Sequence, residues 1–516
     1  MSNTGETAQR AKTYRGQPVH DVVGVGIGPF NLGLAALLQK APEIEAVFFE
    51  RKPQFGWHTG MLIDGTTLQV PFFADLVTMA DPTHPLSFLN YLHEQGRLYH
   101  FYFLEKFHIP RREYDHYCRW ASERLPSCRF GCEVTDVRRV VPADGEVTES
   151  LFEVEVFDQR AGAAKTVFTR HLVLGVGSVP SVPAALRPML GENVFHSADF
   201  LSRRHRLREA RSVTVIGSGQ SAAEVFLELL KEQEACGYRL DWFTRSPGFF
   251  PMEYSKLGLE HFSPDYTRYF YGLPQAKRDE IRSRQGLLYK GISAQAIADI
   301  YDALYDASVG GAQPDVRLLA NAEVEAMEPA GSGYRLNCRH REQGTAFSHE
   351  SDMVVLATGY AHPVPRFLKS LSDIIAWDEE GRYGVEADYS LTLTQELGSR
   401  IYVQNGELHT HGIGAPDLGL GAYRSSAIVN ALAGREVYRL QERTVFQQFG
   451  VSAEGAGAAG AAGKSGSTAG GAGGAAGTEA GAGTKAQATA GAAAATAEGQ
   501  KAALLAEAAA GGSGAR

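Results

Sequence analysis

The sequence predicts an α/β fold with two dinucleotide-binding, Rossmann-like domains, because the order strand, glycine turn and helix occurs twice along the chain. The first copy is the apolar run Val22 to Val25 followed by Gly26-Ile27-Gly28. The second copy is Val213 to Ile216 followed by Gly217-Ser218-Gly219. Short apolar runs of this kind are typical of strands buried in a parallel sheet, and a glycine turn that leads into a helix is typical of nucleotide sites.

The first glycine turn has the features of a pyrophosphate site. Its backbone N–H groups and the positive end of the helix expected over Asn31 to Gln39 together attract an anion. Asn31 stands where the usual fingerprint has its third glycine. The next strand, Val47 to Phe49, ends in Glu50, where an acid is suitably placed to hold a ribose hydroxyl. We therefore predict nucleotide contacts from Gly26, Gly28, Pro29, Asn31 and Glu50.

The chain between the two copies mixes long loops with regular elements. Residues 54–85 are rich in Gly, Pro and aromatic residues, and loops of this length in a compact domain are usually functional. Helical periodicity covers Leu86 to Gln95 and Arg111 to Leu125. Strict alternation over Phe152 to Phe157 predicts a half-exposed strand, and His171 to Gly177 predicts a buried strand that runs into a glycine turn.

The second copy differs from the first at the end of its second strand. That strand, Leu240 to Thr244, is followed by Arg245 and Ser246, where the first copy has an acid. A 2′-phosphate on the ribose repels an acid and attracts a cation and a hydroxyl, so this site is expected to prefer NADPH over NADH. The alternative is a surface arginine that merely follows a strand. The predicted contacts are Gly217, Ser218, Gly219, Gln220, Ser221, Arg245 and Ser246.

Two nucleotide sites of different preference on one chain indicate a flavoenzyme that NADPH reduces. The acid of the first copy suits FAD, whose adenosine ribose carries no phosphate. The chain has no Cys-x-x-Cys motif, which disfavours a disulfide reductase and leaves oxygen or a small acceptor to receive the electrons. A further buried strand, Met353 to Tyr360, is expected to return the chain to the first domain. Its end supplies three more predicted cofactor contacts: Thr358, Gly359 and Tyr360.

The NADPH domain is thus predicted to be inserted in the FAD domain, beside a small substrate-binding region. A strand at Ile401 to Gln404 and a helix from about Tyr423 to Leu440 complete the second part of the FAD domain. The Ala/Gly-rich tail cannot bury enough apolar surface to fold, so we expect it to be disordered. The expected division is a flexible arm (1–18), the FAD domain (19–205), the NADPH domain with substrate-region helices (206–350), the second FAD part with substrate region (351–445) and the tail (452–516).

Composition excludes several other classes of protein. The net charge of −9 over 516 residues is spread without a basic stripe, so nucleic acid is not an expected partner. The chain has no run of eighteen apolar residues and no apolar signal segment, so we expect a cytoplasmic protein without a membrane span. The five cysteines have irregular spacings, which argues against a disulfide framework. Cys128 and Cys132 lack a matching Cys or His pair, so no metal site is predicted.

Several unusual motifs in order resemble one known family over roughly residues 20 to 440. They are Gly26-Ile-Gly-Pro-Phe-Asn31, Phe55-Gly-Trp-His58, Gly60-Met61, Asp75-Leu76, Phe88-Leu-Asn-Tyr-Leu92 and Ala357-Thr-Gly-Tyr360. The chain resembles the flavin-dependent N-hydroxylating monooxygenases of siderophore biosynthesis, which act on lysine, ornithine or diamines. In that family Asn commonly replaces the third glycine of the first turn.

The resemblance implies a class B mechanism with FAD, NADPH and O₂. NADPH reduces FAD, O₂ adds to form a C4a-hydroperoxyflavin, and the terminal amine of the substrate attacks the distal oxygen to give a hydroxylamine. Gln69 matches a family position beside the flavin and is the predicted catalytic residue, with a plain loop glutamine as the alternative. Trp57 and His58 are expected at the cofactor, or simply to pack the flavin loop. The family also implies a homo-oligomer, either a dimer or a tetramer.

Departures from the family pattern suggest the substrate. Relatives that act on amino acids usually hold the substrate carboxylate with a Lys and two Asn residues, and these positions align with Ala74, Leu259 and Gly291. Losing three polar groups makes a carboxylate costly to bury. A diamine instead brings a second ammonium, for which Asp417 and Glu260 are the candidate partners.

The predicted function is N-hydroxylation of a diamine, either cadaverine or putrescine, for a hydroxamate siderophore. The alternatives are an L-lysine N6-monooxygenase and an NADPH oxidase or diaphorase that inserts no oxygen. A ketone or sulfide monooxygenase is disfavoured because the arginine-containing fingerprint of those enzymes is absent between the nucleotide sites. A redox sensor that binds FAD and a protein partner is a further alternative.

Overall fold

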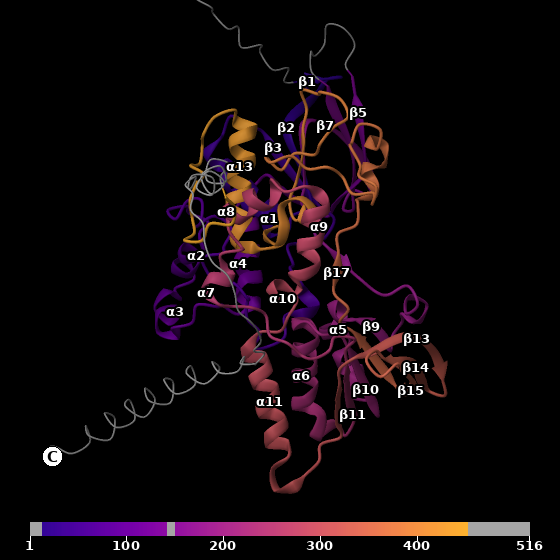
Figure 1. The fold of residues 1–516 in the computed structure, drawn as a ribbon. Coiled ribbons are helices and arrows are strands. Elements are labelled where there is room, and N and C mark those ends of the chain that lie inside the picture. The colour runs from indigo at the N-terminus through magenta and orange to yellow at the C-terminus, as the bar shows by residue number, and fades with distance from the viewer. Residues whose placement is uncertain (1–12, 142–149, 452–516) are drawn as a thin grey trace, which may run out of the picture. The chain divides into compact units, whose positions relative to one another are not determined.

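A computed structural model describes residues 13–141 and 150–451, and Figure 1 shows the arrangement of its elements. The first unit contains an eight-stranded sheet with the order β4-β3-β2-β7-β6-β5, in which β1 also pairs with β2 and β18 with β7. Strands β2, β3, β4, β7 and β18 run parallel, and β5, β6 and β7 form an antiparallel meander. The strands are β1 Thr13–Tyr14, β2 Gln17–Val25, β3 Ala46–Glu50, β4 Cys128–Phe130, β5 Cys132–Val140, β6 Leu151–Asp158, β7 Ala163–Leu174 and β18 Ile401–Val403.

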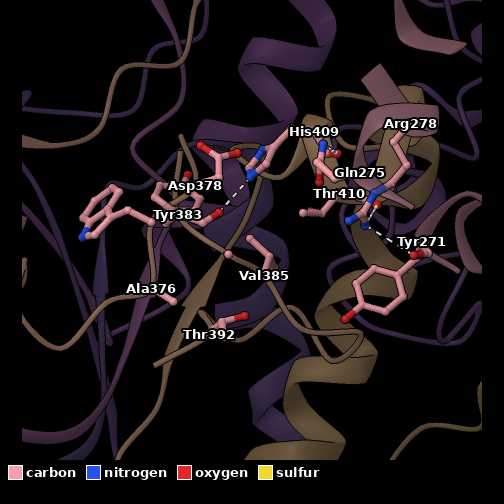
Figure 2. Close-up of a pocket in the computed structure, with 12 residues that line it drawn as sticks. Tyr271, Gln275, Arg278, Ala376, Asp378, Tyr383, Val385, Thr392, His409 and Thr410 are labelled. Carbon is pink, nitrogen blue, oxygen red and sulfur yellow. Dashed lines mark hydrogen bonds between the residues drawn. The ribbon is translucent and has the colours of Figure 1, made fainter. Parts of the chain in front are cut away.

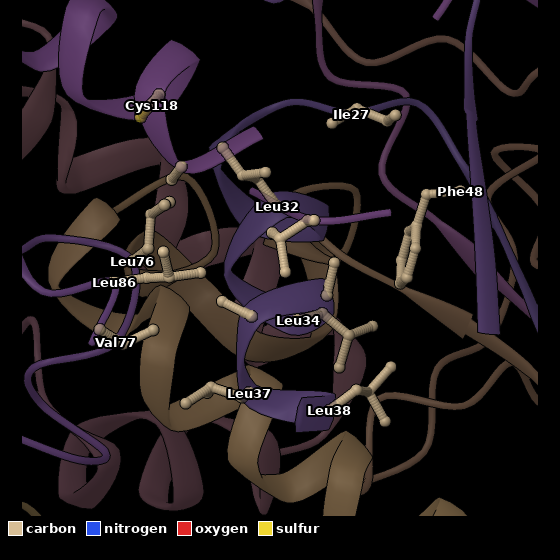
Figure 3. Packing of buried hydrophobic residues seen from close by; sticks show 14 of the residues in the cluster. Ile27, Leu32, Leu34, Leu37, Leu38, Phe48, Leu76, Val77, Leu86 and Cys118 are labelled. Atoms are coloured by element: carbon tan, nitrogen blue, oxygen red, sulfur yellow. The ribbon is translucent and has the colours of Figure 1, made fainter. Parts of the chain in front are cut away.

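The first sheet is covered by a helical layer that centres on α1. Pro29 occupies the first turn of α1, where its fixed φ is favourable and its missing N–H costs nothing. The helix packs against α4 and α13, and Figure 3 shows its leucines, Leu32, Leu34 and Leu37, within the buried core that also holds Phe48. The helices are α1 Pro29–Leu37, α2 Phe88–Glu94, α3 Leu98–Leu104, α4 Arg111–Glu123 and α13 Gly421–Ala433.

The second unit contains an all-parallel sheet with the order β12-β11-β10-β16-β9. Helices α6 and α11 pack on each other beside it, and a three-stranded antiparallel sheet follows β12 in the chain. The elements are β9 Val194–His196, α5 Phe200–Leu207, β10 Ser212–Ile216, α6 Gln220–Cys236, β11 Arg239–Phe243, α11 Ala294–Ala307, β12 Val316–Leu319, β13 Ala322–Ala330, β14 Gly333–His340, β15 Thr345–Ser351 and β16 Met353–Leu356.

Two connecting strands and several short helices complete the described chain. Strands β8 and β17 form a separate antiparallel pair, and β17, labelled in Figure 1, follows β16 in the chain. These elements are β8 Val179–Pro180, α7 Lys256–Leu259, α8 Pro264–Tyr271, α9 Gln275–Arg284, α10 Gly286–Tyr289, β17 Tyr360–Ala361 and α12 Leu408–His411. Over the residues that the structure describes, no helix is long and apolar enough to cross a membrane.

The strand at Met353 to Leu356 corrects one prediction. It was expected to return the chain to the first domain, yet β16 pairs in parallel with β10 and β9, both in the second sheet. A buried apolar run followed by glycine does not reveal which sheet it joins, since strand pairing is decided by contacts distant in sequence. Because the second sheet draws on residues 194–356, the expected boundaries at 205/206 and 350/351 each fall inside it.

The two ends of the first unit also differ from expectation. Residues 13–18 belong to the expected flexible arm, but β1 pairs with β2 and the Tyr14 ring packs edge-on against Phe168 with a centroid distance of 5.0 Å. The helix expected to reach Leu440 ends at Ala433, because Gly434 adopts a left-handed conformation with φ of 64° and terminates it. Residues 1–12 of the expected arm and the tail over 452–516 lie outside the described residues.

Candidate active site

The first glycine turn leaves backbone open at the N-terminus of α1. Gly26 has φ of +87°, and a Cβ at this position would lie 2.5 Å from the carbonyl oxygen of Gly175. Gly28 is the N-cap of α1 and makes no side-chain capping bond. A Cβ on Gly28 would meet no atom within 4 Å, so the space beside the helix end is free. This combination suits a pyrophosphate at the positive end of the helix.

Asn31 supports this turn from within the protein. Its side chain is fully buried, and its amide nitrogen donates to the carbonyl oxygen of Gly26 at 2.9 Å and to that of Val25 at 3.3 Å. Its amide oxygen accepts a hydrogen bond from Gln404 Nε2 at 2.8 Å. Asn31 therefore fixes the shape of the turn through backbone contacts, rather than facing the nucleotide with a free polar group. Sequence reasoning missed Gln404, whose only signal is its place directly after β18.

Glu50 lies at the end of β3, as predicted, and connects that strand to the turn. Its two carboxylate oxygens accept hydrogen bonds from the backbone N–H groups of Ile27 at 3.0 Å and Lys52 at 2.9 Å. Each carboxylate oxygen can accept a second bond, so a ribose hydroxyl can still donate to this group. The open helix end and the half-buried acid together fit the adenosine diphosphate part of FAD.

The second glycine turn also precedes the N-terminus of a helix, but Arg245 and Ser246 stand beside it in place of an acid. Gly217 has φ of +148°, and a Cβ there would lie 2.2 Å from the carbonyl oxygen of Ala357, which directly follows β16. Gly219 is the N-cap of α6 and makes no side-chain capping bond. Ser246 Oγ donates to Ser218 Oγ at 3.0 Å, which brings the end of β11 to the turn. Arg245 is exposed, and no residue in the described part of the chain pairs with its guanidinium. These groups fit the 2′-phosphate of NADPH.

The first residues of α6 take part in a contact with the first unit. Gln220 Nε2 donates to Glu224 Oε1 at 2.8 Å, and Gln220 Oε1 accepts from the backbone N–H of Ser293 at 2.7 Å. Arg111, at the start of α4, donates to both oxygens of Glu224 at 2.6 and 2.7 Å. Burial raises the pKa of Glu224, and Arg111 opposes that shift. Gln220 thus supports the site through protein contacts, while half-buried Ser221 lies beside it in the first turn.

The predicted flavin loop meets the chain that follows β16. The His58 ring lies 4.8 Å from that of Trp57 and 5.4 Å from that of Tyr360, both in edge-on contacts. Desolvation, assisted by nearby Arg111, lowers the pKa of His58 to about 4, so this imidazole is neutral near pH 7. Thr358 Oγ1 donates to the carbonyl oxygen of Ser181 at 2.6 Å. The Phe55–His58 segment and the Thr358–Tyr360 segment therefore form one aromatic cluster.

Gly359 allows the chain to turn at this cluster. It has φ of +86°, a conformation that glycine adopts without strain. Its carbonyl oxygen accepts a hydrogen bond from His196 Nε2 at 3.0 Å, and the His196 and Tyr360 rings are 5.1 Å apart. The predicted cofactor residue Tyr360 is held on two sides by histidine rings.

Tyr254, which sequence reasoning missed, lies near both Gln69 and Asp417, and Ala74 lies beside the turn that carries Asp417. Tyr254 Oη donates to the carbonyl oxygen of Gln69 at 3.3 Å. Burial and the Asp417 charge raise the pKa of Tyr254 to about 12. A Cβ on Gly419 would lie 2.8 Å from Asp417 Oδ1 and 4.0 Å from the Ala74 Cβ. Gln69 Nε2 is buried and, among the described residues, has no hydrogen-bond partner, so it can donate to a bound flavin or substrate.

Asp417 is a carboxylate held in place by backbone groups. Its Oδ1 accepts the N–H of Gly419 at 2.8 Å and caps the 3-10 turn Leu418–Leu420. Protein surrounds the side chain, while part of its surface stays accessible. Desolvation raises the pKa of Asp417 to about 6, against the opposing effect of the backbone N–H groups. Behind this turn, the buried ion pair of Arg424 and Glu407 also binds the carbonyl oxygen of Ala415 at 2.9 Å.

The other three predicted substrate residues have different environments. Glu260 accepts backbone N–H groups of Phe446 at 3.1 Å and Gln447 at 3.0 Å, so both of its oxygens hold the segment after α13. Leu259, at the end of α7, is 40% exposed. Gly291 is a packing glycine, since a Cβ there would lie 2.6 Å from the backbone nitrogen of Met252. The structure therefore groups Asp417, and not Glu260, with Gln69 and Ala74.

A separate pocket of about 380 Å³ lies away from these residues. Figure 2 shows Asp378, Tyr383 and His409 on one side of it and Tyr271, Gln275 and Arg278 on the other. His409 Nε2 donates to the carbonyl oxygen of Tyr383 at 2.8 Å, and Gln275 Nε2 donates to that of His409 at 3.1 Å. No sequence-predicted site residue lines this pocket.

The two nucleotide turns, one closed by an acid and the other flanked by a free arginine, define a flavin- and NADPH-dependent oxidoreductase. A family model for L-lysine 6-monooxygenase/L-ornithine 5-monooxygenase matches residues 18–362. The chain belongs to this family and is a flavin-dependent N-hydroxylating monooxygenase. FAD and NADPH are its cofactors.

Three relatives illustrate the similarity. The rhizobactin siderophore biosynthesis protein RhbE of Rhizobium meliloti is 49% identical over 438 residues, which cover 84% of this chain and 95% of the relative. The putrescine N-hydroxylase of Shewanella oneidensis is 42% identical, with 84% of each chain covered. The crystal structure of DfoA with FAD, the desferrioxamine-pathway cadaverine monooxygenase of Erwinia amylovora, is 41% identical with a TM-score of 0.80, and the match covers 85% of this chain and 100% of DfoA.

Proposed function

We propose that this chain hydroxylates one terminal amine of an aliphatic diamine, putrescine or cadaverine, for the synthesis of a hydroxamate siderophore. The observation that supports the proposal is the position of Asp417 beside Ala74 and, through Tyr254, near Gln69: Asp417 supplies an anion for a distal ammonium, and Ala74 supplies no positive charge for a substrate carboxylate. Similarity to a putrescine N-hydroxylase and to a cadaverine monooxygenase supports the same substrate class.

The two ends of a diamine meet different demands in this site. The distal ammonium pairs with Asp417, whose carboxylate is charged above a pKa of about 6. The reacting amine must be neutral to attack, although a free alkylammonium has a pKa of about 10.4. A pocket that excludes water favours the neutral amine, because desolvation disfavours the charged form. Ala74, buried with 5% exposure, is a small apolar side chain beside the Asp417 turn.

The protein's own residues bind and orient the reactants. The first unit would hold FAD through its glycine turn and Glu50, and the second would hold NADPH through its turn with Arg245 and Ser246. When bound, the two cofactors supply the electrons and the activation of O₂. The buried Gln69 amide donates a hydrogen bond at the reaction centre, and Tyr254 fixes the Gln69 backbone. The net reaction converts amine, O₂, NADPH and H⁺ to hydroxylamine, NADP⁺ and H₂O.

A product assay tests the proposal. The protein with FAD is incubated with NADPH and each of putrescine, cadaverine, lysine and ornithine, and hydroxylamine and peroxide are measured separately. We expect hydroxylamine from at least one diamine in close to equal amount with the NADPH consumed. Robust lysine hydroxylation without diamine turnover would refute the diamine assignment. Peroxide without hydroxylamine from any amine would instead make the chain an NADPH oxidase.

We further propose that the protein acts in the cytoplasm as a homo-oligomer, with the small-molecule amine and O₂ as its reaction partners. The cytoplasm supplies NADPH and amine substrates together. A size measurement of the purified protein tests the assembly, and a monomer at every concentration would refute it.

A further inference from the structure

The pocket between α9 and residues 376–392 contains a cation that no carboxylate neutralises. Arg278, on α9, lines this cavity of about 380 Å³ together with residues of α12. The other basic residues of α9, Lys277, Arg282 and Arg284, each pair with an acid. Arg278 is half-buried and makes no ion pair within the described part of the chain. We call this cavity the Arg278 pocket.

The hydrogen bonds of Arg278 leave one edge of its guanidinium group available. Nη1 donates to the carbonyl oxygens of Tyr271 and Thr410, both at 3.3 Å, and Figure 2 shows Arg278 beside these two residues. Nε is buried, and neither Nε nor Nη2 has an acceptor among the described residues. A carboxylate matches this edge, because its two oxygens can accept from Nε and Nη2 side by side. A buried donor without an acceptor is destabilising, and a bound carboxylate would remove that cost.

The acids near the pocket do not neutralise Arg278. Asp378 accepts hydrogen bonds from Arg382 Nε at 2.6 Å and from the Arg382 N–H at 2.8 Å. Asp279 also accepts from Arg382, at 2.9 and 3.1 Å. Glu386 is exposed, so water and salt screen its charge. Burial lowers the pKa of Arg278, yet a guanidinium stays charged at physiological pH. One net positive charge therefore remains on the wall of the pocket.

The N-terminus of α9 lies at the same wall. Gln275 is the first residue of this ten-residue helix and lines the pocket, and the N-cap, Pro274, makes no side-chain capping bond. The positive end of the helix adds to the charge of Arg278, and both favour an anion. One cation and one helix end balance a single negative charge. A second negative charge would be buried without a partner, so a monocarboxylate suits this pocket better than a phosphate monoester.

The rest of the lining suits a flat apolar body. Five of the lining residues are aromatic or aliphatic: Tyr271, Ala376, Trp377, Tyr383 and Val385. Trp377 Nε1 donates to the carbonyl oxygen of Ser372 at 2.9 Å, and Tyr383 Oη donates to that of Gly406 at 3.3 Å. These acceptors do not line the pocket, so the two rings supply it with mainly apolar surface. The volume is at the lower end of the range for small-molecule sites.

We propose that the Arg278 pocket binds a small monocarboxylate with a flat apolar body, such as an aromatic acid. The carboxylate accepts from the Nε and Nη2 edge of Arg278, and the body packs among the rings of Tyr271, Trp377 and Tyr383. No residue predicted to hold a cofactor or the diamine lines this pocket. The site is therefore distinct from the reaction centre and does not depend on the function proposed above.

Calorimetric titration of the full chain with FAD and saturating NADP⁺ tests the site, with benzoate as the probe. NADP⁺ fills the second nucleotide site, so benzoate cannot bind at Arg245. We expect a dissociation constant of about 1 mM or below for a ligand of this size. Benzamide has the same shape without the charge, and acetate lacks the ring. Each should bind at least about tenfold more weakly than benzoate. Absence of benzoate binding, or equal binding of benzamide or acetate, would overturn the proposal.

Two variants test whether the probe binds in this pocket. Arg278→Met removes the guanidinium group, and Ala376→Leu fills part of the cavity while Arg278 stays in place. Arg284→Met is the matched control on the same helix, where the side chain is 76% exposed. The affinity for benzoate should fall at least about tenfold in both test variants and stay unchanged in the control. Wild-type affinity in either test variant would refute the location.

Thermal unfolding separates a lost site from a lost fold. Benzoate at about ten times its dissociation constant should raise the Tm of the wild type and of Arg284→Met, because a ligand that binds the folded state stabilises it. It should leave the Tm of Ala376→Leu unchanged; a rise equal to that of the wild type would contradict the proposal. Ala376→Leu keeps the hydrogen bonds of Arg278, so this test stands even where Arg278→Met does not fold. Phenyl phosphate distinguishes the two kinds of anion, and tighter binding of phenyl phosphate than of benzoate would overturn the monocarboxylate assignment.

Discussion

Replacing Asp417 by Asn removes the charge of this side chain and keeps its hydrogen bond. The amide oxygen of Asn can still accept the N–H of Gly419, which Asp417 Oδ1 accepts at 2.8 Å, so the 3-10 turn Leu418–Leu420 keeps its cap. The position also carries a carboxyl whose pKa is raised to about 6 by burial. Asp417→Asn is therefore a change in the electrostatics of the site with little change in its shape.

The expected loss follows from a charge-assisted hydrogen bond to the distal ammonium. Such bonds contribute about 1.5–3 kcal/mol, which is roughly a ten- to hundredfold change in affinity. Because the distal ammonium is the same in the ground state and the transition state, the loss appears in KM, while kcat changes little. We expect the KM for putrescine and cadaverine to rise by about ten- to hundredfold.

Steady-state assays of hydroxylamine formation measure this change, with butylamine as the substrate that lacks the second amine. Wild type and Asp417→Asn should use butylamine equally poorly, because butylamine has no second ammonium to pair with residue 417. Comparing two enzymes with two substrates therefore isolates the interaction between Asp417 and the distal ammonium. Glu260→Gln provides the comparison carboxylate and should leave the diamine KM unchanged. A diamine KM that is unaffected by Asp417→Asn, or one that responds to Glu260→Gln instead, would refute the assignment.

The pH dependence of kcat/KM for diamines is a second test of the role of Asp417. The carboxyl of Asp417 is neutral below its pKa of about 6, so kcat/KM for diamines should fall as the pH falls through that value. In Asp417→Asn this limb should disappear. Because the folded pKa is raised above the ordinary 3.8, the free energy of unfolding decreases as the pH rises between these values. Above pH about 6, Asp417→Asn should therefore be at least as stable as the wild type.

Three other predictions concern the nucleotide turns and the substrate wall. Arg245→Ala should raise the KM for NADPH about tenfold or more and change that for NADH little, because only NADPH carries the 2′-phosphate; equal effects in initial-rate assays would contradict this. Asn31→Gly restores the usual fingerprint but removes several buried hydrogen bonds, so thermal unfolding should show a loss of about 2–3 kcal/mol and FAD content should fall. Ala74→Lys should pair with Asp417, weaken diamine binding and give no useful lysine turnover, whereas a large gain in lysine turnover would favour the amino-acid assignment.

Local features of the fold could be predicted because they depend on residues that are close together in the sequence. The two glycine turns, the strand that ends in Glu50, and the strand that precedes Arg245 all lie where the sequence predicts them. A positive φ at Gly26 or Gly359 is a local requirement, and glycine meets it without help from distant residues.

Features that depend on distant partners could not be predicted in this way. The apolar run of β16 fits either sheet, and its pairing with β10 is decided by residues about 140 positions away. Asp417 and Glu260 are both acids in plausible places, but only contacts with residues 446 and 447 reveal that Glu260 is engaged elsewhere. Aligned by motif, Gly291 stands where relatives have an Asn, which suggests that a polar side chain has been lost. The structure shows instead that the backbone of Met252 leaves no space for a Cβ at this position.

The arrangement around Asp417 explains why a diamine, rather than an amino acid, suits this site. A diamine must present a cation at one end and a neutral amine at the other, so the protein needs an anion at a fixed distance from a dry reaction centre. Asp417 is desolvated enough for its pKa to be raised to about 6, yet backbone N–H groups and Arg424 keep it ionised near pH 7. We propose that a carboxylate in this state pairs with the distal ammonium of the diamine, which replaces the water that burial has removed. Lysine would bring a carboxylate together with its α-ammonium, and Ala74 offers no positive charge to hold that carboxylate.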